Sequence, residues 1–277
     1  MVVECAWRGC VAWVCGLVRD VGAIHAIKTR CRGFRLVGAD LDRYFRFIMS
    51  TIALQLQQVH ARMAQACTAA GRDPSKVTLL CVSKTQLPDA VREAFAAGER
   101  SFGENYVQEG VDKIATLVDL RSRIAWHLIG PLQSNKTRVV AEHFDWVHSV
   151  DRLKIAQRLS EQRPEHLAPL QICLQVNISG EASKSGLLPG DVAEVAKAVS
   201  LLPRLQLRGL MSIPEPANTE AAQRLPHVAL RELFNVLIAN GLPLDTLSMG
   251  MTADMDAAIL EGATVVRVGT AIFGARA

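Results

Sequence analysis

The sequence lacks several features that would assign it to a large class of protein. No run of 18 apolar residues occurs in the 277-residue chain, so no membrane-spanning helix is predicted. Aromatic residues make up only 5% of the chain, with just two tyrosines, and no segment is rich in lysine or arginine. Nucleic-acid binding usually needs a basic strip for the phosphates and aromatic rings for the bases, so it is not expected here.

Paired cysteines are also missing. The seven cysteines include no CxxC pair, and four of them lie in the first 48 residues. Cys81 and Cys173 lie within apolar runs, where a free thiol behaves as a small hydrophobic group. This usage favours a reducing, cytoplasmic location over a disulfide framework. His143 and His148 have no carboxylate or cysteine at the spacing of metal ligands, so no metal site is predicted.

The first 48 residues differ from the rest of the chain in charge and patterning. They hold eight Lys or Arg and four Asp or Glu, whereas residues 49–277 hold 23 of each, so the net charge of +4 comes from the first part. The segment shows neither helical nor strand periodicity, and Met49 follows it directly. We interpret residues 1–48 as a disordered extension or a wrongly assigned start, and residues 49–277 as the folded unit.

Regular secondary-structure signals begin at Met49. Apolar residues at Ile52, Leu56, Val59 and Met63 recur at helical spacing, and the pattern stops at "AAGRDP". An opening helix is therefore predicted.

Eight short runs rich in apolar and β-branched residues follow this helix. They lie near residues 77–83, 100–104, 123–129, 145–149, 170–177, 205–213, 244–249 and 264–268. Helical patterns separate them, beginning near Pro88, Val107, Ser134, Asp151, Pro189, Thr219 and Ala253. Eight strands alternating with helices over about 230 residues predict a single (β/α)8 TIM barrel. A doubly wound open sheet is the alternative, but no GxGxxG follows the first strand.

The first apolar run, "VTLLCVSKT", leads straight into a lysine. In a (β/α)8 barrel the C-terminal ends of the strands line the active-site mouth, so Lys84 is expected at that rim. Burial lowers the pKa of a lysine amine below its ordinary value of about 10.4 and makes the neutral, nucleophilic form accessible. Such an amine is suited to forming an imine. The alternative is a lysine that simply extends its amine into solvent.

The segments after the seventh and eighth strands are suited to binding a phosphate. Barrels commonly bind phosphate there through backbone N–H groups at a helix start. Residues 248–252, "SMGMT", and the pair Gly269-Thr270 combine glycines with hydroxyl side chains. Ordinary glycine-containing turns capped by Ser or Thr are the alternative. Because strand eight neighbours strand one in a closed barrel, a phosphate held here would lie close to Lys84.

Arg267 is expected on the inward face of the eighth strand, with Val265 and Gly269. An inward Arg needs an acceptor, either the nitrogen of an aromatic ring or a carboxylate in a structural ion pair. An amine nucleophile, a phosphate site and an Arg partner for a ring nitrogen together describe pyridoxal 5'-phosphate held as a Schiff base.

Long motifs of the sequence resemble the pyridoxal phosphate homeostasis protein family. They are "LLCVSKT", "FGENYVQE", "WHLIGPLQSNK", "VNISGEASKSG", "GLMSIP" and "SMGMTADMDAAILEGATVVRVGTAIFGAR", and the resemblance runs from about Met49 to Arg276. It implies a barrel of the alanine racemase N-terminal-domain type, fold type III, with pyridoxal phosphate on Lys84. It further implies that Asn105 lies beside the cofactor and that its phosphate and ring nitrogen are held by Ser248, Gly250, Thr252, Arg267, Gly269 and Thr270.

Other polar residues are predicted to have structural roles. His127, next to Trp126 on an apolar run, is more often a satisfied core histidine than an acid or base. Lys136 and Lys184 lie in matching motifs, but solvated loop lysines are the ordinary interpretation. Tyr106 is expected to pack at a helix start.

The resemblance favours a carrier over an enzyme. A racemase with this cofactor needs acid or base groups on both faces of the substrate, commonly a lysine and a tyrosine. The chain ends soon after strand eight, and its only tyrosines are Tyr44 and Tyr106. We therefore expect no catalytic residues and a protein that stores, buffers or delivers pyridoxal phosphate to apoenzymes, as a monomer or weak dimer without nucleic-acid or membrane partners. A slow amino-acid racemase or another type III enzyme is the alternative.

Overall fold

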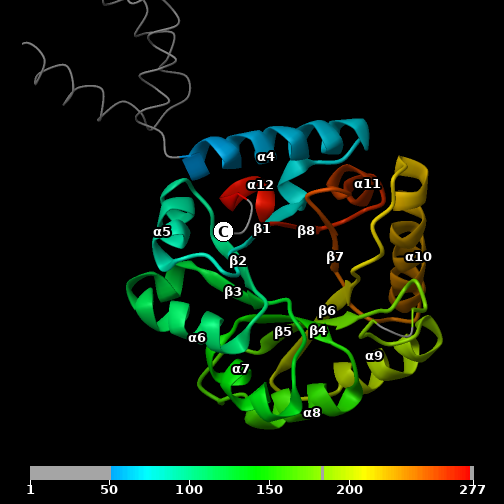
Figure 1. Cartoon of the computed structure of the whole chain (residues 1–277). Coiled ribbons are helices and arrows are strands. Elements are labelled where there is room, and N and C mark those ends of the chain that lie inside the picture. The colour runs from blue at the N-terminus through cyan, green and yellow to red at the C-terminus, as the bar shows by residue number, and fades with distance from the viewer. Residues whose placement is uncertain (1–50, 182–183, 275–277) are drawn as a thin grey trace, which may run out of the picture. The chain divides into compact units, whose positions relative to one another are not determined.

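A closed parallel barrel forms the body of the protein. The computed structural model describes residues 51–181 and 184–274. Within them eight parallel strands follow one another around the barrel in sequence order, and the first pairs with the eighth (Figure 1). The predicted (β/α)8 barrel is thereby confirmed. The expectations for residues 1–48 lie outside the described residues. None of the helices in the described ranges has the length and apolar character that a membrane span requires.

Each strand overlaps one of the predicted runs. The strands are β1 (Thr78–Val82), β2 (Ser101–Glu104), β3 (Ala125–Leu128), β4 (Trp146–Val150), β5 (Leu170–Gln175), β6 (Leu205–Met211), β7 (Thr246–Met251) and β8 (Val265–Val268). Both faces of a strand are buried in such a barrel, one by the interior and one by the helices, which is why the runs read as continuously apolar. In β7 a register shift against β8 between Ser248 and Met251 marks a bulge.

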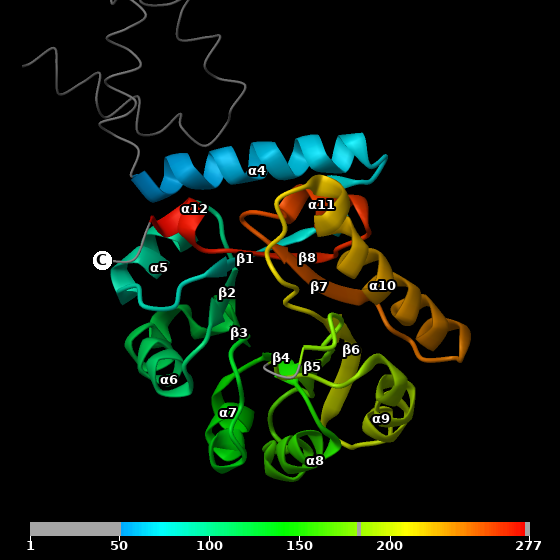
Figure 2. The same ribbon diagram turned by 45° about the vertical axis from the view of Figure 1, so that its right-hand side comes forward.

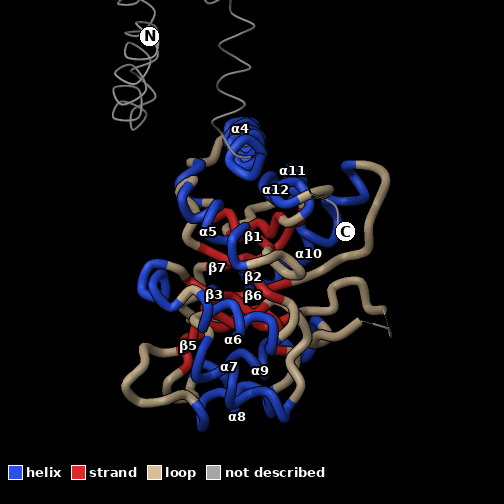
Figure 3. The backbone as a smooth tube through the Cα atoms, turned by 60° about the vertical axis from the view of Figure 1, so that its left-hand side comes forward, coloured by secondary structure: helices blue, strands red, loops and turns tan. Residues whose placement is uncertain are grey.

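Helices surround the strands on the outside (Figures 2 and 3). They are α4 (Thr51–Ala69), α5 (Pro88–Ala96), α6 (Val107–Thr116), α7 (Thr137–His143), α8 (Leu153–Gln162), α9 (Val192–Ser200), α10 (Glu220–Ala239), α11 (Met255–Leu260) and α12 (Thr270–Phe273). Pro88 occupies the first turn of α5, where its missing N–H costs nothing. The Thr219 hydroxyl caps α10 by accepting from the Ala222 N–H. The four-residue α12 is too short for a periodic signal and was not among the predicted helices.

The opening helix α4 lies beside the seam where β8 meets β1. It packs against α5, α11 and α12 (Figures 1 and 2). Leu56, Val59 and Met63 are buried on its inner face, as the helical spacing predicted. This position brings α4 next to the loops that follow β7 and β8.

The apolar core has two parts. The larger part fills the space between the strands and the helices and includes Trp126 and Phe102, whose ring centroids lie 6.0 Å apart. A smaller cluster of Leu80, Ile129 and Val265 is separate from it, and Val82 packs against this cluster. Leu80 pairs in register with Arg267, and side chains opposite one another in a parallel pair share a face. The small cluster therefore lies with Arg267 on the inward face of the barrel wall.

Candidate functional site

Lys84 follows β1 at the rim of the barrel. The strand ends at Val82, but the Ser83 N–H still donates to the Gly103 carbonyl of β2 at 3.0 Å, so pairing continues for one residue. The Ser83 hydroxyl points outward, where it donates to Glu104. Leu80 and Val82 face inward, so the alternation along β1 points to the inward side for Lys84. Lys84 is partly buried and opens a turn in which the Gln86 N–H donates to the Ser83 carbonyl at 3.0 Å. The lysine is thus two residues beyond the end of the strand.

Gly269 lies directly across from the end of β1. A Cβ atom at Gly269 would be 3.1 Å from the Val82 carbonyl oxygen and 3.3 Å from the Val82 Cβ. Glycine therefore allows the end of β8 to approach β1 closely and leaves the inward space beside Lys84 free of a side chain. Thr270 opens α12, and the first N–H groups of a helix have no partner within the helix. The lysine and these N–H groups share one sector of the rim.

Arg267 projects from β8 and is only 4% exposed. Its Nη1 donates to the Ser248 carbonyl at 2.7 Å and to the Ser248 hydroxyl at 2.8 Å, and its Nη2 donates to the Ser212 carbonyl at 2.8 Å. A guanidinium has five N–H donors, so two remain for another acceptor. Burial lowers the pKa of Arg267 to about 10, which leaves it charged at neutral pH. Within the described ranges its hydrogen-bond partners are serine oxygens and it forms no ion pair with a carboxylate.

A chain of hydrogen bonds continues from Arg267 across the barrel. The Ser248 Oγ lies 2.8 Å from His148 Nδ1, and His148 Nε2 lies 2.9 Å from His127 Nδ1. We call Arg267, Ser248, His148 and His127 the barrel network. Burial lowers the pKa of His127 to about 3 and that of His148 well below its ordinary value, so both rings are neutral at neutral pH.

The neutral rings give the barrel network a direction. Because the Ser248 hydroxyl accepts from Arg267, its own proton goes to His148 Nδ1. The His148 Nε2–H then donates to His127 Nδ1, and His127 stacks on Trp146 with ring centroids 5.3 Å apart. The donors therefore run from the cationic Arg267 toward β3, which fixes the orientation of the guanidinium.

Ser248 lies within β7, as the predicted run 244–249 implied, and not in the loop that follows it. The bulge extends β7 through Met251, so Ser248 is fully buried inside the strand. Its hydroxyl is committed to Arg267 and His148, and the helix after it, α11, begins at Met255 instead of Ala253.

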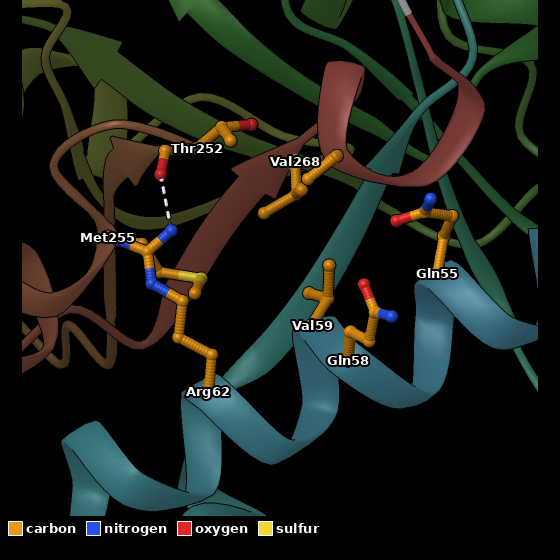
Figure 4. A pocket seen from close by; sticks show the side chains of 8 residues that line it. Gln55, Gln58, Val59, Arg62, Thr252, Met255 and Val268 are labelled. Carbon is orange, nitrogen blue, oxygen red and sulfur yellow. Dashed lines mark hydrogen bonds between the residues drawn. The ribbon is translucent and has the colours of Figure 1, made fainter.

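Gly250 and Thr252 shape the turn from β7 to α11. Gly250 has a φ of +87°, and a Cβ there would lie 2.4 Å from the Cβ of Ala258 on α11, so any other residue would force the strand and helix apart. The Met251 N–H donates to Asp254 at 2.7 Å. The Thr252 carbonyl accepts from Arg62 Nη1 of α4 at 2.7 Å (Figure 4). The opening helix therefore helps to hold this turn.

A cavity of about 170 Å³ lies beside the Arg62 contact. It is lined by Gln55, Gln58, Val59 and Arg62 of α4, Thr252 and Met255 around the start of α11, and Val268 and Ala271 (Figure 4). Val268 adjoins the inward Arg267 on β8 and therefore faces outward. The cavity is thus on the helix side of the barrel wall and is distinct from the mouth.

Asn105 and Tyr106 follow β2, which pairs with β1 on the side away from β8. The Asn105 backbone packs closely on Gly130, where a Cβ would lie only 2.1 Å from the Asn105 carbonyl oxygen. Asn105 itself is partly buried, whereas Tyr106 is 60% exposed at the start of α6.

Two further lysines lie in loops that follow other strands, Lys136 after β3 and Lys184 after β5. Lys136 is exposed, and Lys184 pairs with Glu181 at 2.6 Å. The structure thus brings Lys84, Arg267, Gly269 and Thr270 together, with Ser248 beneath them in the barrel network. Sequence reasoning missed His148 and Ser212, whose only signal was their place near the ends of apolar strands.

Comparison with known proteins gives consistent results. Residues 54–277 match the family model described as alanine racemase, N-terminal domain. A protein named pyridoxal phosphate homeostasis protein from Pseudomonas aeruginosa is 63% identical over 82% of this chain and 97% of its own length. The protein of that name from Escherichia coli K12 is 53% identical over 82% of this chain and 98% of its own length.

Solved structures agree with this assignment of fold. PipY of Synechococcus elongatus, solved with PLP bound, is 39% identical with a TM-score of 0.71, covering 80% of this chain and 100% of PipY. An alanine racemase from Corynebacterium glutamicum has a TM-score of 0.62 at 16% identity, covering 82% of this chain and 62% of the racemase. At that identity the likeness concerns the fold alone.

Proposed function

This chain belongs to the alanine racemase N-terminal domain family and, within it, to the pyridoxal phosphate homeostasis proteins, and from that membership we propose that it binds pyridoxal 5'-phosphate as a Schiff base on Lys84. One observation carries the proposal. Lys84 emerges on the inward side of the rim across from Gly269, in the same mouth as the two spare donors of Arg267. When bound, the cofactor supplies an aldehyde carbon to the lysine amine.

The residues at the mouth fit such a ligand. A phosphorylated pyridine aldehyde needs an amine, donors for its phosphate and a donor for its ring nitrogen. The Ser212 Oγ beside Arg267 is fully buried, and no described residue provides it with a hydrogen-bond partner. A buried hydroxyl without a partner is costly, and a polar ligand in the mouth would satisfy it.

We assign a role to each predicted site residue. Arg267 would face the ring nitrogen. Gly250, Thr252, Gly269 and Thr270 would surround the phosphate with backbone N–H groups and hydroxyls, and Asn105 would contact the cofactor from the end of β2, next to Lys84. Because its hydroxyl is already engaged, Ser248 would act through Arg267 by holding the guanidinium. In this proposal Ser248 supports Arg267, and the other predicted site residues contact the cofactor directly.

We further propose that the protein acts in the cytoplasm to store, buffer or deliver pyridoxal phosphate to apoenzymes, as a monomer or weak dimer. A racemase would need a second acid or base facing the Lys84 amine. Tyr106 is the one tyrosine in the described ranges, and it is mostly in solvent. The two histidines of the barrel network are neutral and bonded to each other. These observations favour a carrier.

Borohydride reduction of the purified protein tests the Schiff base. The protein as isolated, or after addition of pyridoxal phosphate, should absorb as an imine, and reduction should bleach that band. Peptide mapping by mass spectrometry should then find the pyridoxyl adduct on the peptide that contains Lys84. An adduct mainly on Lys136, Lys184 or another lysine would contradict the assignment.

Exchange of the α-proton of alanine or serine in deuterated water distinguishes carrier from racemase. A carrier should exchange the proton no faster than free pyridoxal phosphate at the same concentration. A clearly faster rate, lost in Lys84→Ala, would show that the protein is an enzyme of this fold type.

A further inference from the structure

The turn that presents Lys84 has an uncommon backbone. The next residue, Thr85, has a φ of +63°. β-Branched residues rarely adopt this left-handed conformation, so the surroundings must hold it in place. Conformations of this kind concentrate where a side chain must be presented in one orientation.

Side chains hold both neighbours of Lys84. On one side the Ser83 carbonyl accepts from Lys113 Nζ at 2.6 Å, and the Ser83 hydroxyl donates to Glu104 at 2.7 Å. On the other side the Thr85 N–H donates to the Glu109 carboxylate. The backbone is therefore fixed immediately before and immediately after the lysine.

The three charged residues that hold the turn also bind one another. Lys113 Nζ donates to Glu109 at 2.6 Å and to Glu104 at 2.9 Å. Glu104 is fully buried and Lys113 is 4% exposed, and such groups are costly to remove from water unless they are paired. The side chains of this group also bond to Ser83 and to the Thr85 N–H, the residues on either side of Lys84. We call Glu104, Glu109 and Lys113 the turn clamp.

We propose that the turn clamp positions the Lys84 amine for imine formation, with Glu109 as its accessible positioning residue. The inference rests on the proposed function, in which Lys84 carries the Schiff base. A reacting amine must lie within a fraction of an ångström of its productive position, and loosening of its support slows the reaction. The phosphate-binding loops belong to β7 and β8 and share no residue with the turn clamp. Loss of the turn clamp should therefore slow imine formation without releasing the ligand.

Variants at Glu109 test this proposal against a matched control. Glu109→Ala removes the acceptor of the Thr85 N–H and one partner of Lys113. Glu109→Gln keeps an oxygen that can accept from Thr85. Asp112→Ala removes the same charge from the exposed face of α6, where the Asp112 carboxylate accepts from Gln108 of the same helix.

Two measurements are made on each variant. Amide hydrogen exchange of the peptide spanning the turn is followed without cofactor, and the rate of imine formation is followed by absorbance after mixing with pyridoxal phosphate. Glu109→Ala should exchange the Thr85 amide about tenfold faster and form the imine about tenfold more slowly, a change of about 1.4 kcal/mol in each case. Glu109→Gln keeps a weaker, neutral acceptor and should give intermediate rates, each changed about threefold from the wild type, and Asp112→Ala should match the wild type.

The outcomes separate this proposal from the proposed function. Unchanged exchange in Glu109→Ala overturns the turn clamp without reference to any ligand, and faster exchange with an unchanged imine rate overturns its positioning role. If Glu109→Ala does not fold, Glu109→Gln decides by the same two rates: the proposal requires the intermediate, about threefold changes, and wild-type values for both rates overturn it. A pyridoxyl adduct on another lysine of the wild type overturns the proposed function. It then also removes the proposed role of the turn clamp in imine formation.

Discussion

The two sides of the barrel mouth are built from different interactions. On the lysine side, β1, β2 and α6 hold Lys84 through the turn clamp, a group of buried charges on the outer face of the wall. On the other side, which we call the phosphate side after the phosphate that we propose it binds, β7 and β8 rely on glycines and on the barrel network, where Arg267 is bonded to serine oxygens and, through Ser248, to neutral histidines. The two sides share no residue. A covalent anchor and an ionic anchor for one ligand should therefore be separable by mutation.

Burial also gives the two sides opposite responses to pH. On the lysine side, burial raises the pKa of Glu104. On the phosphate side, burial lowers the pKa of His127 and His148. Both shifts disfavour the charged form, but a carboxyl charges as pH rises and an imidazole charges as pH falls. Titration of Glu104 should therefore lower the free energy of unfolding as pH rises, and titration of the two histidines should raise it.

Lys84→Ala should have the largest effect, because it removes the covalent anchor and leaves the ionic one. The imine band should disappear completely. The loops around Gly250 and Gly269 should still retain some pyridoxal phosphate, with the spectrum of a free aldehyde and faster loss on dialysis. Absorbance and equilibrium dialysis measure both effects. Complete loss of binding in a folded Lys84→Ala protein would show that the two anchors are not separable.

Arg267→Ala should weaken the ionic anchor and change the cofactor's absorbance. A hydrogen bond to a charged group contributes about 1.5–3 kcal/mol, which corresponds to about a tenfold to 100-fold loss of affinity. The substitution also leaves the Ser212 carbonyl and Ser248 without their buried donor, so the free energy of unfolding should fall by about 1–3 kcal/mol.

Arg267→Lys provides the matched control. It keeps the charge but not the planar fork of donors, so its affinity should lie between those of the wild type and Arg267→Ala. Unchanged affinity and spectrum in Arg267→Ala would place the guanidinium away from the ligand.

The fold and the strand-end positions of Lys84 and Gly269 could be predicted from the sequence. The hydrogen-bond networks around these residues could not. Eight apolar runs alternating with helices indicate a barrel because each strand is covered on both faces. Lys84 and Gly269 were recognisable because their strand-end position is itself local. The bond between His148 and Ser248 joins residues 100 positions apart, and no spacing rule specifies such a pair. The predicted run ended at residue 249, whereas β7 continues to Met251, because nothing in the sequence indicated the bulge.

His127→Gln should change the pH dependence of the free energy of unfolding, with a smaller effect than the two substitutions above. The folded-state pKa of His127 is lowered to about 3, so below about pH 6.5 the unfolded state binds the extra proton and the free energy of unfolding falls with pH. One such histidine contributes about 1.4 kcal/mol per pH unit, or about 2 kcal/mol between pH 6.5 and 5. Urea unfolding of His127→Gln across that range should show a correspondingly smaller decline.

Glu104→Gln should change the same profile in the opposite direction. Because the folded-state pKa of Glu104 is raised, the native state binds more protons than the unfolded state above the ordinary value of 4.5, and its contribution to stability declines as pH rises through the folded pKa. Removing that titration should make the wild-type rise of stability with pH steeper. If both variants changed the profile in the same direction, the contrast between the two sides would be wrong.

Arg62→Ala should have the smallest effect, because it removes a contact that reaches the turn after β7 from α4, outside the barrel wall. Arg62 holds the Thr252 carbonyl and pairs with Asp256, but both side chains of that ion pair are more than a third exposed, so about 0.2–1 kcal/mol of stability is expected to be lost. A looser turn after β7 should release pyridoxal phosphate about two- to fivefold faster, a change of the same order in energy.

Arg72→Ala is the control, because Arg72 bonds the Ile259 and Ala263 carbonyls near the far end of α11 and does not contact that turn. It should lower stability without changing the release rate, since Arg72 supports the far end of α11 and not the turn that follows β7. Equal release rates for all three proteins would show that the turn after β7 keeps its shape through Gly250 and Asp254 alone.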